Sequence, residues 1–152
     1  MRGWNKCASL MLVLSGSALA QAPCPAERAD RVQIGAQRFA VEVAATPAVR
    51  ERGLSGRDRL AADAGMWFVL PEVGMPGFWM RGMRFPLDLI WVSPEQRVAG
   101  ATSLPPCAHD PCPIAYPPVA VAYVLEVAAG RFAGRAGDRV EWHCSGAAGE
   151  TP

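Results

Sequence analysis

The chain has 152 residues, of which 15 are basic and 14 are acidic, and its hydrophobic fraction is 51%. This length suits one domain of ordinary size and excludes two. The formal charge of +1 and the lack of a basic run argue against a nucleic-acid-binding protein, so we expect no nucleic-acid partner.

The first residues of the chain predict a secretory signal peptide. Arg2 and Lys6 supply a positive start, residues 10–19 form a short apolar core, and Ala18-Leu19-Ala20 is a small-residue cleavage site. The core is well short of the ~20 apolar residues that a membrane-spanning helix needs. We therefore expect cleavage after residue 20 and a periplasmic or secreted protein without a membrane span. The mature chain would begin at Gln21, which N-terminal sequencing of the exported protein would show.

The cysteines indicate two disulfides. Of the five cysteines, Cys7 lies in the predicted signal peptide and four remain, an even number that permits three connectivities. Cys107 and Cys112 flank a tight loop, whereas Cys24 and Cys144 lie near the two ends of the chain. We therefore favour the pairs Cys107–Cys112 and Cys24–Cys144.

Metal binding is an alternative role for the same residues. Cys107, His109 and Cys112, together with His143-Cys144, carry side chains that bind metals. Their spacing is not a usual zinc pattern, and an oxidising compartment favours disulfides. We expect no metal and no other cofactor.

The mature chain divides into a domain with two short tails. We expect an N-terminal tail over residues 21–34, one globular domain over residues 35–144 and a C-terminal tail over residues 145–152. Removal of the signal peptide leaves 13 arginines and no lysine against 14 acidic residues, a formal charge of −1. The domain is expected to be a monomer.

A strand and a short helix begin the domain. Phe39, Val41 and Val43 alternate with smaller or polar residues, which is typical of a half-buried strand. Thr46-Pro47 then provides an N-cap and a first-turn proline, and Gly53 provides a stop. These signals predict a helix over residues 47–53.

The strongest strand signals follow that helix. Residues 66–70 and 87–92 are apolar runs, and residues 119–127 alternate for longer than any other segment. Residues 103–118 contain six prolines and predict an irregular loop. Residues 130–136 are predicted to form a second short helix.

These elements, with a last strand over residues 139–142, predict a β-rich α+β domain. We expect a curled mixed or antiparallel sheet, or a small barrel, of about six to eight strands. The two short helices are expected to cover its openings.

Several short motifs along the domain carry a family resemblance. They are Glu51-Arg52-Gly53-Leu54-Ser55-Gly56-Arg57, Gly65-Met66-Trp67-Phe68-Val69, Phe78-Trp79-Met80-Arg81, Phe85-Pro86-Leu87-Asp88, Tyr123-Val124-Leu125-Glu126-Val127-Ala128-Ala129-Gly130 and Gly137-Asp138-Arg139-Val140. The series, which covers about residues 35–142, resembles the domain of unknown function 192 family. Members are small proteins often found as exported domains in bacteria. The resemblance implies fold and compartment, and the family has no established activity that it could add.

Two positions depart from the family pattern. Ser55 stands where a methionine is frequent, and Gly82-Met83 stands where Asn-Thr is often found. If those amide and hydroxyl groups serve a site in relatives, that part of the site is absent here.

Six residues spread over these motifs are the candidate site: Arg52, Arg57, Trp79, Arg81, Asp88 and Glu126. The two carboxylates lie within apolar strand patterns, where a buried charge needs a partner. The arginines can bind a small anionic or sugar ligand, with the tryptophan as a stacking face. The alternative is that Arg–carboxylate pairs only tie loops to the sheet. We expect at least one of the carboxylates to be largely buried and bonded to an arginine or to backbone N–H groups.

The sequence favours an exported binding or accessory module that uses this Arg/Trp/carboxylate pocket. The alternative from another class is a hydrolase of cell-envelope carbohydrate with Asp88 and Glu126 as its two acids. The hydrolase requires both carboxylates to face one open cleft without arginine partners.

Overall fold

The structure, a computed structural model, describes residues 24–145, so the predicted signal peptide lies outside the described range. Its elements in chain order are η1 (Ala26–Arg28), β1 (Arg31–Ile34), β2 (Gln37–Ala44), α1 (Pro47–Arg52), β3 (Ala64–Gly74), β4 (Phe78–Trp79), β5 (Leu87–Val92), β6 (Val98–Leu104), β7 (Ile114–Ala115), β8 (Val121–Ala128) and β9 (Val140–His143). Within this range, no helix has the length and apolar character needed to cross a membrane.

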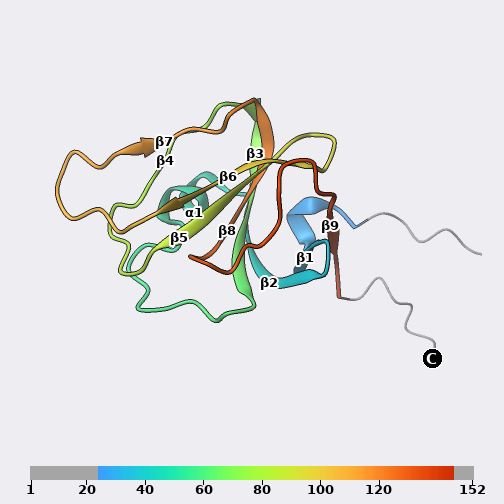
Figure 1. Cartoon of the computed structure of the whole chain (residues 1–152), viewed down its shortest axis with the longest axis horizontal. Helices are drawn as coiled ribbons and strands as arrows, with labels where there is room; N and C mark the ends of the chain where they lie inside the picture. Colours follow the sequence, from blue (N-terminus) through green and yellow to red (C-terminus); the bar gives the residue numbers. More distant parts are fainter. Residues whose placement is uncertain (1–23, 146–152) are drawn as a thin grey trace, which may run out of the picture.

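Seven strands form one curled, mixed sheet (Figure 1). The strand order is β6-β5-β8-β3-β2-β1-β9, and β2 with β3 is its parallel pair. Val98 N donates to Asp138 O at 2.9 Å, and Val140 N donates to Gln96 O at 2.8 Å. These two bonds connect the beginning of one edge strand, β6, with the beginning of the other, β9. The sheet is therefore a half-barrel, which confirms the β-rich, curled-sheet prediction, and β4 and β7 form a separate pair.

Strand alternation builds an apolar layer on each face of the sheet. Trp67 of β3 and Leu125 of β8 belong to the first layer. Their chain neighbours Phe68 and Val124 point the other way and belong to the second layer, together with Leu54 just after α1. The second layer is the one that carries the candidate site.

The helix predicted over residues 47–53 is confirmed as α1. Thr46 Oγ1 accepts a hydrogen bond from Val49 N at 3.4 Å, and Gly53 ends the helix at a φ of 50°. Arg50 Nη1 donates to Val69 O at 3.1 Å, so the helix is tied to β3. This tie places the C-terminal end of α1 over the second layer.

The prediction of a second helix over residues 130–136 is wrong. Gly130 has a φ of +78°, which a right-handed helix does not allow. The N–H groups of Gly130 and Phe132 donate to the carboxylate of Asp88, and the side chain of Gln37 binds the backbone on either side of Phe132. Side chains distant in sequence therefore satisfy the backbone groups that a helix would have paired.

The sheet begins earlier in the chain than the sequence suggested. Strand β1 (Arg31–Ile34) pairs with β2 on one side and β9 on the other, and Val32 is fully buried. Residues from Arg31 onward thus belong to the sheet and not to the tail predicted over residues 21–34.

The structure contains both disulfides that the sequence favours. Cys24 is bonded to Cys144 and Cys107 to Cys112. Trp142 Nε1 also donates to Cys24 O at 2.8 Å, which holds the N-terminal segment against β9. Because the four sulfur atoms are bonded in two pairs, they do not offer the thiolates that the metal alternative needs.

Candidate functional site

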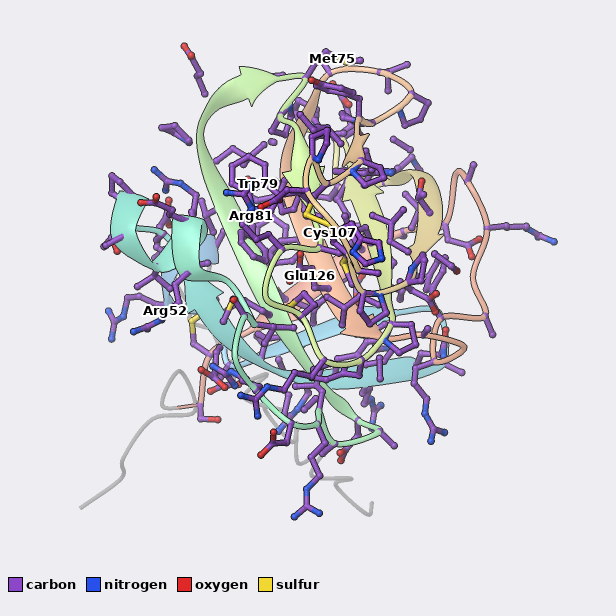
Figure 2. All side chains as sticks on the ribbon, turned by 90° about the vertical axis from the view of Figure 1, so that its left-hand side faces the viewer. Arg52, Met75, Trp79, Arg81, Cys107 and Glu126 are labelled. Carbon is purple, nitrogen blue, oxygen red and sulfur yellow. A yellow bond between two sulfur atoms is a disulfide. The ribbon has the colours of Figure 1, made fainter. Side chains whose placement is uncertain are left out.

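A cavity of about 400 Å³ opens between α1 and the second apolar layer of the sheet. Helix α1 and the turn after it supply one wall, β3 and residues 76–83 supply another, and β5 and β8 lie at the bottom. Figure 2 shows the labelled side chains of this region. Four of the six predicted site residues line the cavity, namely Arg52, Trp79, Arg81 and Glu126.

Most of the cavity wall is apolar, and its apolar residues were not among the predicted site residues. They are Leu54, Phe68, Leu70, Phe78, Met83 and Leu87. The rings of Phe68 and Phe78 meet edge to face, with centroids 5.1 Å apart. The apolar strand pattern around Phe68 predicts a core residue, and no signal in the sequence indicates that its side chain lines a cavity. Such a wall suits the apolar body of a small ligand.

Glu126 supplies the buried polar group of the cavity. Glu126 is 6% exposed, and the residues opposite it on the neighbouring strands are Met66 of β3 and Leu89 of β5. No other described side chain or backbone group forms a hydrogen bond or ion pair with its carboxylate, and burial raises its pKa from 4.5 to about 8. Glu126 is therefore mostly protonated at neutral pH, when its carboxyl can donate one hydrogen bond and accept others.

Charged side chains surround the apolar wall. Arg50, Glu51 and Arg52 come from α1, and Arg81 comes from the turn after β4. Arg50 is held by backbone carbonyl groups, whereas Arg52 is exposed and forms no ion pair with a described residue. The lining thus holds three arginines against Glu51 and the protonated Glu126, so its side chains carry a net positive charge.

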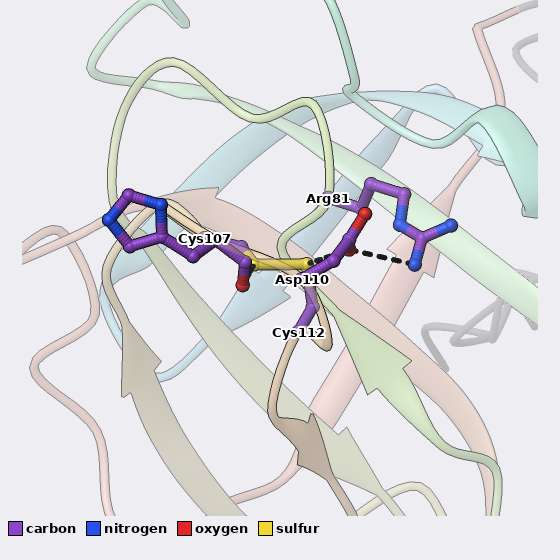
Figure 3. Close-up of a disulfide and its surroundings, with 5 residues drawn as sticks. Arg81, Cys107, Asp110 and Cys112 are labelled. Atoms are coloured by element: carbon purple, nitrogen blue, oxygen red, sulfur yellow. Dashed lines mark hydrogen bonds and ion pairs between the residues drawn. A yellow bond between two sulfur atoms is a disulfide. The ribbon is translucent and has the colours of Figure 1, made fainter.

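Trp79 and Arg81 lie at the mouth of the cavity. Trp79 is 50% exposed and pairs with Ile114 across β4 and β7. Arg81 Nη2 donates to Asp110, which sits within the loop closed by the second disulfide, at 2.9 Å (Figure 3). Both partners are about two-thirds exposed, and such pairs contribute only ~0–1 kcal/mol. Arg81 can therefore leave Asp110 for a ligand at little cost.

Arg57 is not part of the cavity. Its guanidinium binds both carboxylate oxygens of Glu42, at 2.5 and 2.7 Å. This hydrogen-bonded pair holds the pKa of Glu42 below its usual range. Arg57 thus ties the segment after α1 to β2, which is the structural alternative that the sequence left open.

Asp88 lies on the other face of the sheet. It is 5% exposed and accepts hydrogen bonds from Gly130 N at 2.8 Å, Phe132 N at 3.3 Å and Ser103 Oγ at 2.5 Å. The expectation that one of the two carboxylates would be buried and bonded to backbone N–H groups is confirmed here. Its role is to anchor the segment after β8.

The hydrolase alternative, with Asp88 and Glu126 as a pair of catalytic acids, is wrong for a geometric reason. In the β5–β8 ladder Asp88 lies opposite Val127, and Leu89 lies opposite Glu126. Directly opposed residues share a face, and adjacent residues point to opposite faces. Asp88 and Glu126 therefore project from opposite sides of the sheet and cannot act on one glycosidic bond.

The segments that contain Ser55 and Gly82-Met83 contact each other. Ser55 and Met83 both line the cavity, and Gly56 N donates to Gly82 O at 2.9 Å. A side chain at Gly82, which has a φ of +72°, would begin 2.3 Å from Ser55 Oγ. Two neighbouring segments, one after α1 and one after β4, therefore meet at this part of the cavity wall.

Known structures support the fold. A candidate transcription regulator from Sinorhizobium meliloti 1021 is 30% identical, with a TM-score of 0.66, and the match covers 74% of this chain and 92% of that one. A protein of unknown function from Novosphingobium aromaticivorans DSM 12444 is 28% identical, with a TM-score of 0.68, covering 89% and 100%. No curated protein has significant similarity. Residues 30–142 match the sequence profile of DUF192, described as "Uncharacterized ACR, COG1430", and the chain therefore belongs to that family.

Proposed function

We propose that this protein is an exported binding or accessory module and that the cavity beside α1 is its ligand site. The observation that carries the proposal is Glu126, a buried carboxyl that faces the cavity and has no partner among the described residues. An ionisable group in such a place costs stability, and buried groups with strongly shifted pKa values concentrate at functional sites.

The surroundings of Glu126 support a binding role. A mostly apolar cavity with a few convergent polar groups is the usual form of a small-molecule site. Trp79 at the mouth offers a flat face for stacking, and Arg52 and Arg81 offer planar donors. Export is supported by the charged start, apolar core and small-residue site of residues 1–20.

A thermal-shift screen of envelope sugars and small organic ions tests the proposal. A ligand at about 100 times its dissociation constant adds roughly 2.7 kcal/mol to the folded state, which raises the melting temperature by several degrees. We expect at least one compound to do so with the wild-type protein. The increase should shrink in Trp79→Ala, which removes the stacking face at the mouth.

Tyr116→Ala is the matched control for that variant. Tyr116 is also an exposed aromatic residue, at 57%, but it does not line the cavity. A ligand-induced shift that Trp79→Ala and Tyr116→Ala leave equally intact would place binding elsewhere. A screen with no stabilising compound would contradict the proposed function.

A further inference from the structure

The charges around the cavity indicate which class of ligand it takes, an inference that rests on the proposed function. We infer that the cavity binds a small organic anion, a carboxylate or phosphate on an apolar body, whose oxyanion lies between Glu126 and the arginines that line the cavity. The arginines of the cavity neutralise the charge of this oxyanion.

The balance of charge favours an anion over a cation. Arg50, Arg52 and Arg81 line the cavity, and Glu51 is the acid at its rim. None of these groups pairs with Glu126, whose pKa burial raises to about 8. A cation would have to ionise Glu126 and also sit beside three guanidinium groups. An anion can accept hydrogen bonds from the guanidinium groups of Arg52 and Arg81.

The arginines are placed to accept such a partner. Arg52 is exposed without an ion pair in the described part of the chain, and Arg81 holds Asp110 only through a solvent-exposed pair. Guanidinium groups bind carboxylates and phosphates through two parallel hydrogen bonds. Both side chains can therefore turn towards an oxyanion without breaking a buried contact.

The apolar body of the ligand has a matching surface. Phe68, Phe78 and Leu87 line the interior, and Trp79 is half exposed at the mouth. The volume of about 400 Å³ holds a ring with a short side chain. A phenyl group carrying a carboxylate is therefore a suitable probe.

Glu126 makes the affinity for an anion depend on pH. An ionised Glu126 would repel the oxyanion and could no longer donate to it. Across the sheet Glu126 faces the apolar residues Met66 and Leu89, and the charged groups that share its cavity are Arg50, Glu51, Arg52 and Arg81. Arginines stay charged throughout the range in which Glu126 titrates. The pH dependence above neutrality should therefore come from Glu126.

Calorimetric titration with three probes of one shape tests the inference: 3-phenylpropanoate, 3-phenylpropylammonium and 3-phenylpropanol. We expect the anion to bind at least about tenfold more tightly than the other two near pH 7. Its affinity should be nearly constant between about pH 6 and pH 7, where the carboxyl group of the probe is ionised, and fall by up to roughly tenfold per pH unit above pH 8. In Glu126→Gln, which keeps a donor but cannot ionise, this fall should disappear.

A pair of arginine variants tests the charge of the site separately. Arg52→Gln should weaken binding of 3-phenylpropanoate about fivefold or more and leave 3-phenylpropanol within about twofold. Arg59→Gln is the control, because Arg59 is exposed and does not line the cavity. It should leave both affinities unchanged.

Three outcomes overturn the anion inference. Tighter binding of 3-phenylpropylammonium, with an affinity that rises above pH 8, would make the cavity a cation site. Equal binding of all three probes would show that charge is not recognised, and the proposed binding function would stand in both cases. Failure of all three probes to bind would also overturn the inference, and the broad thermal-shift screen decides separately whether the cavity binds any ligand.

Discussion

Glu126→Gln is expected to be more stable than the wild-type protein at neutral pH. Glu126 ionises near 4.5 in the unfolded chain, but burial holds its folded-state pKa at about 8. The contribution of Glu126 to the free energy of unfolding of the wild type is therefore fully present below about pH 4.5. It is lost as the pH rises towards 8, because the unfolded chain releases the proton first. The difference between variant and wild type should grow to on the order of 3 kcal/mol at pH 7.

Urea unfolding of both proteins between about pH 4 and pH 8 measures this difference. Glu72→Gln controls for the loss of one negative charge, because Glu72 is an exposed residue of the same strand that borders the cavity, β3. A difference between Glu126→Gln and wild type that does not change with pH would show that Glu126 is ionised in the folded protein. A stabilising substitution at Glu126 would fit a residue that is present for binding at the expense of stability.

Removal of the Cys24–Cys144 disulfide is expected to have the largest effect on stability. The bond joins residues 120 positions apart, and in the chain-entropy model a loop of that length contributes about 4–5 kcal/mol. The double variant Cys24→Ser/Cys144→Ser should lose about that much free energy of unfolding.

The second disulfide provides the matched comparison. Cys107 and Cys112 are 5 positions apart, so Cys107→Ser/Cys112→Ser should lose only roughly 2 kcal/mol. Denaturant unfolding of the two variants measures the ranking, and non-reducing peptide mapping checks the connectivity first. Equal losses in the two variants would contradict the account based on loop length.

Local sequence signals predicted those parts of the fold that depend on local interactions. Thr46-Pro47 and Gly53 are cap signals, and α1 begins and ends where they indicate. The helix predicted over residues 130–136 fails because Asp88, 42 positions before Gly130, binds the backbone there. A contact at that separation leaves no periodic signal in the sequence.

The candidate site was also predicted only in part, because its assembly depends on contacts between residues distant in sequence. The residue types Arg, Trp and Glu were predicted, but membership of one cavity depends on strand register. Asp88 and Glu126 were grouped because both interrupt apolar strands, and only the pairing of Leu89 with Glu126 shows that they face opposite sides. Arg57 was grouped by its motif, whereas its partner Glu42 lies on a strand earlier in the chain.

The central claim is that a protonated Glu126 faces a ligand cavity, and its titration by carbon NMR tests this most directly. The carboxyl signal is assigned by its absence from Glu126→Gln and followed with and without 3-phenylpropanoate. We expect a midpoint at about pH 8 in the free protein and a higher midpoint in the complex, because a bound anion favours the protonated form of Glu126. A midpoint near 4.5 in the free protein, or one that the ligand leaves unchanged, would contradict the central claim.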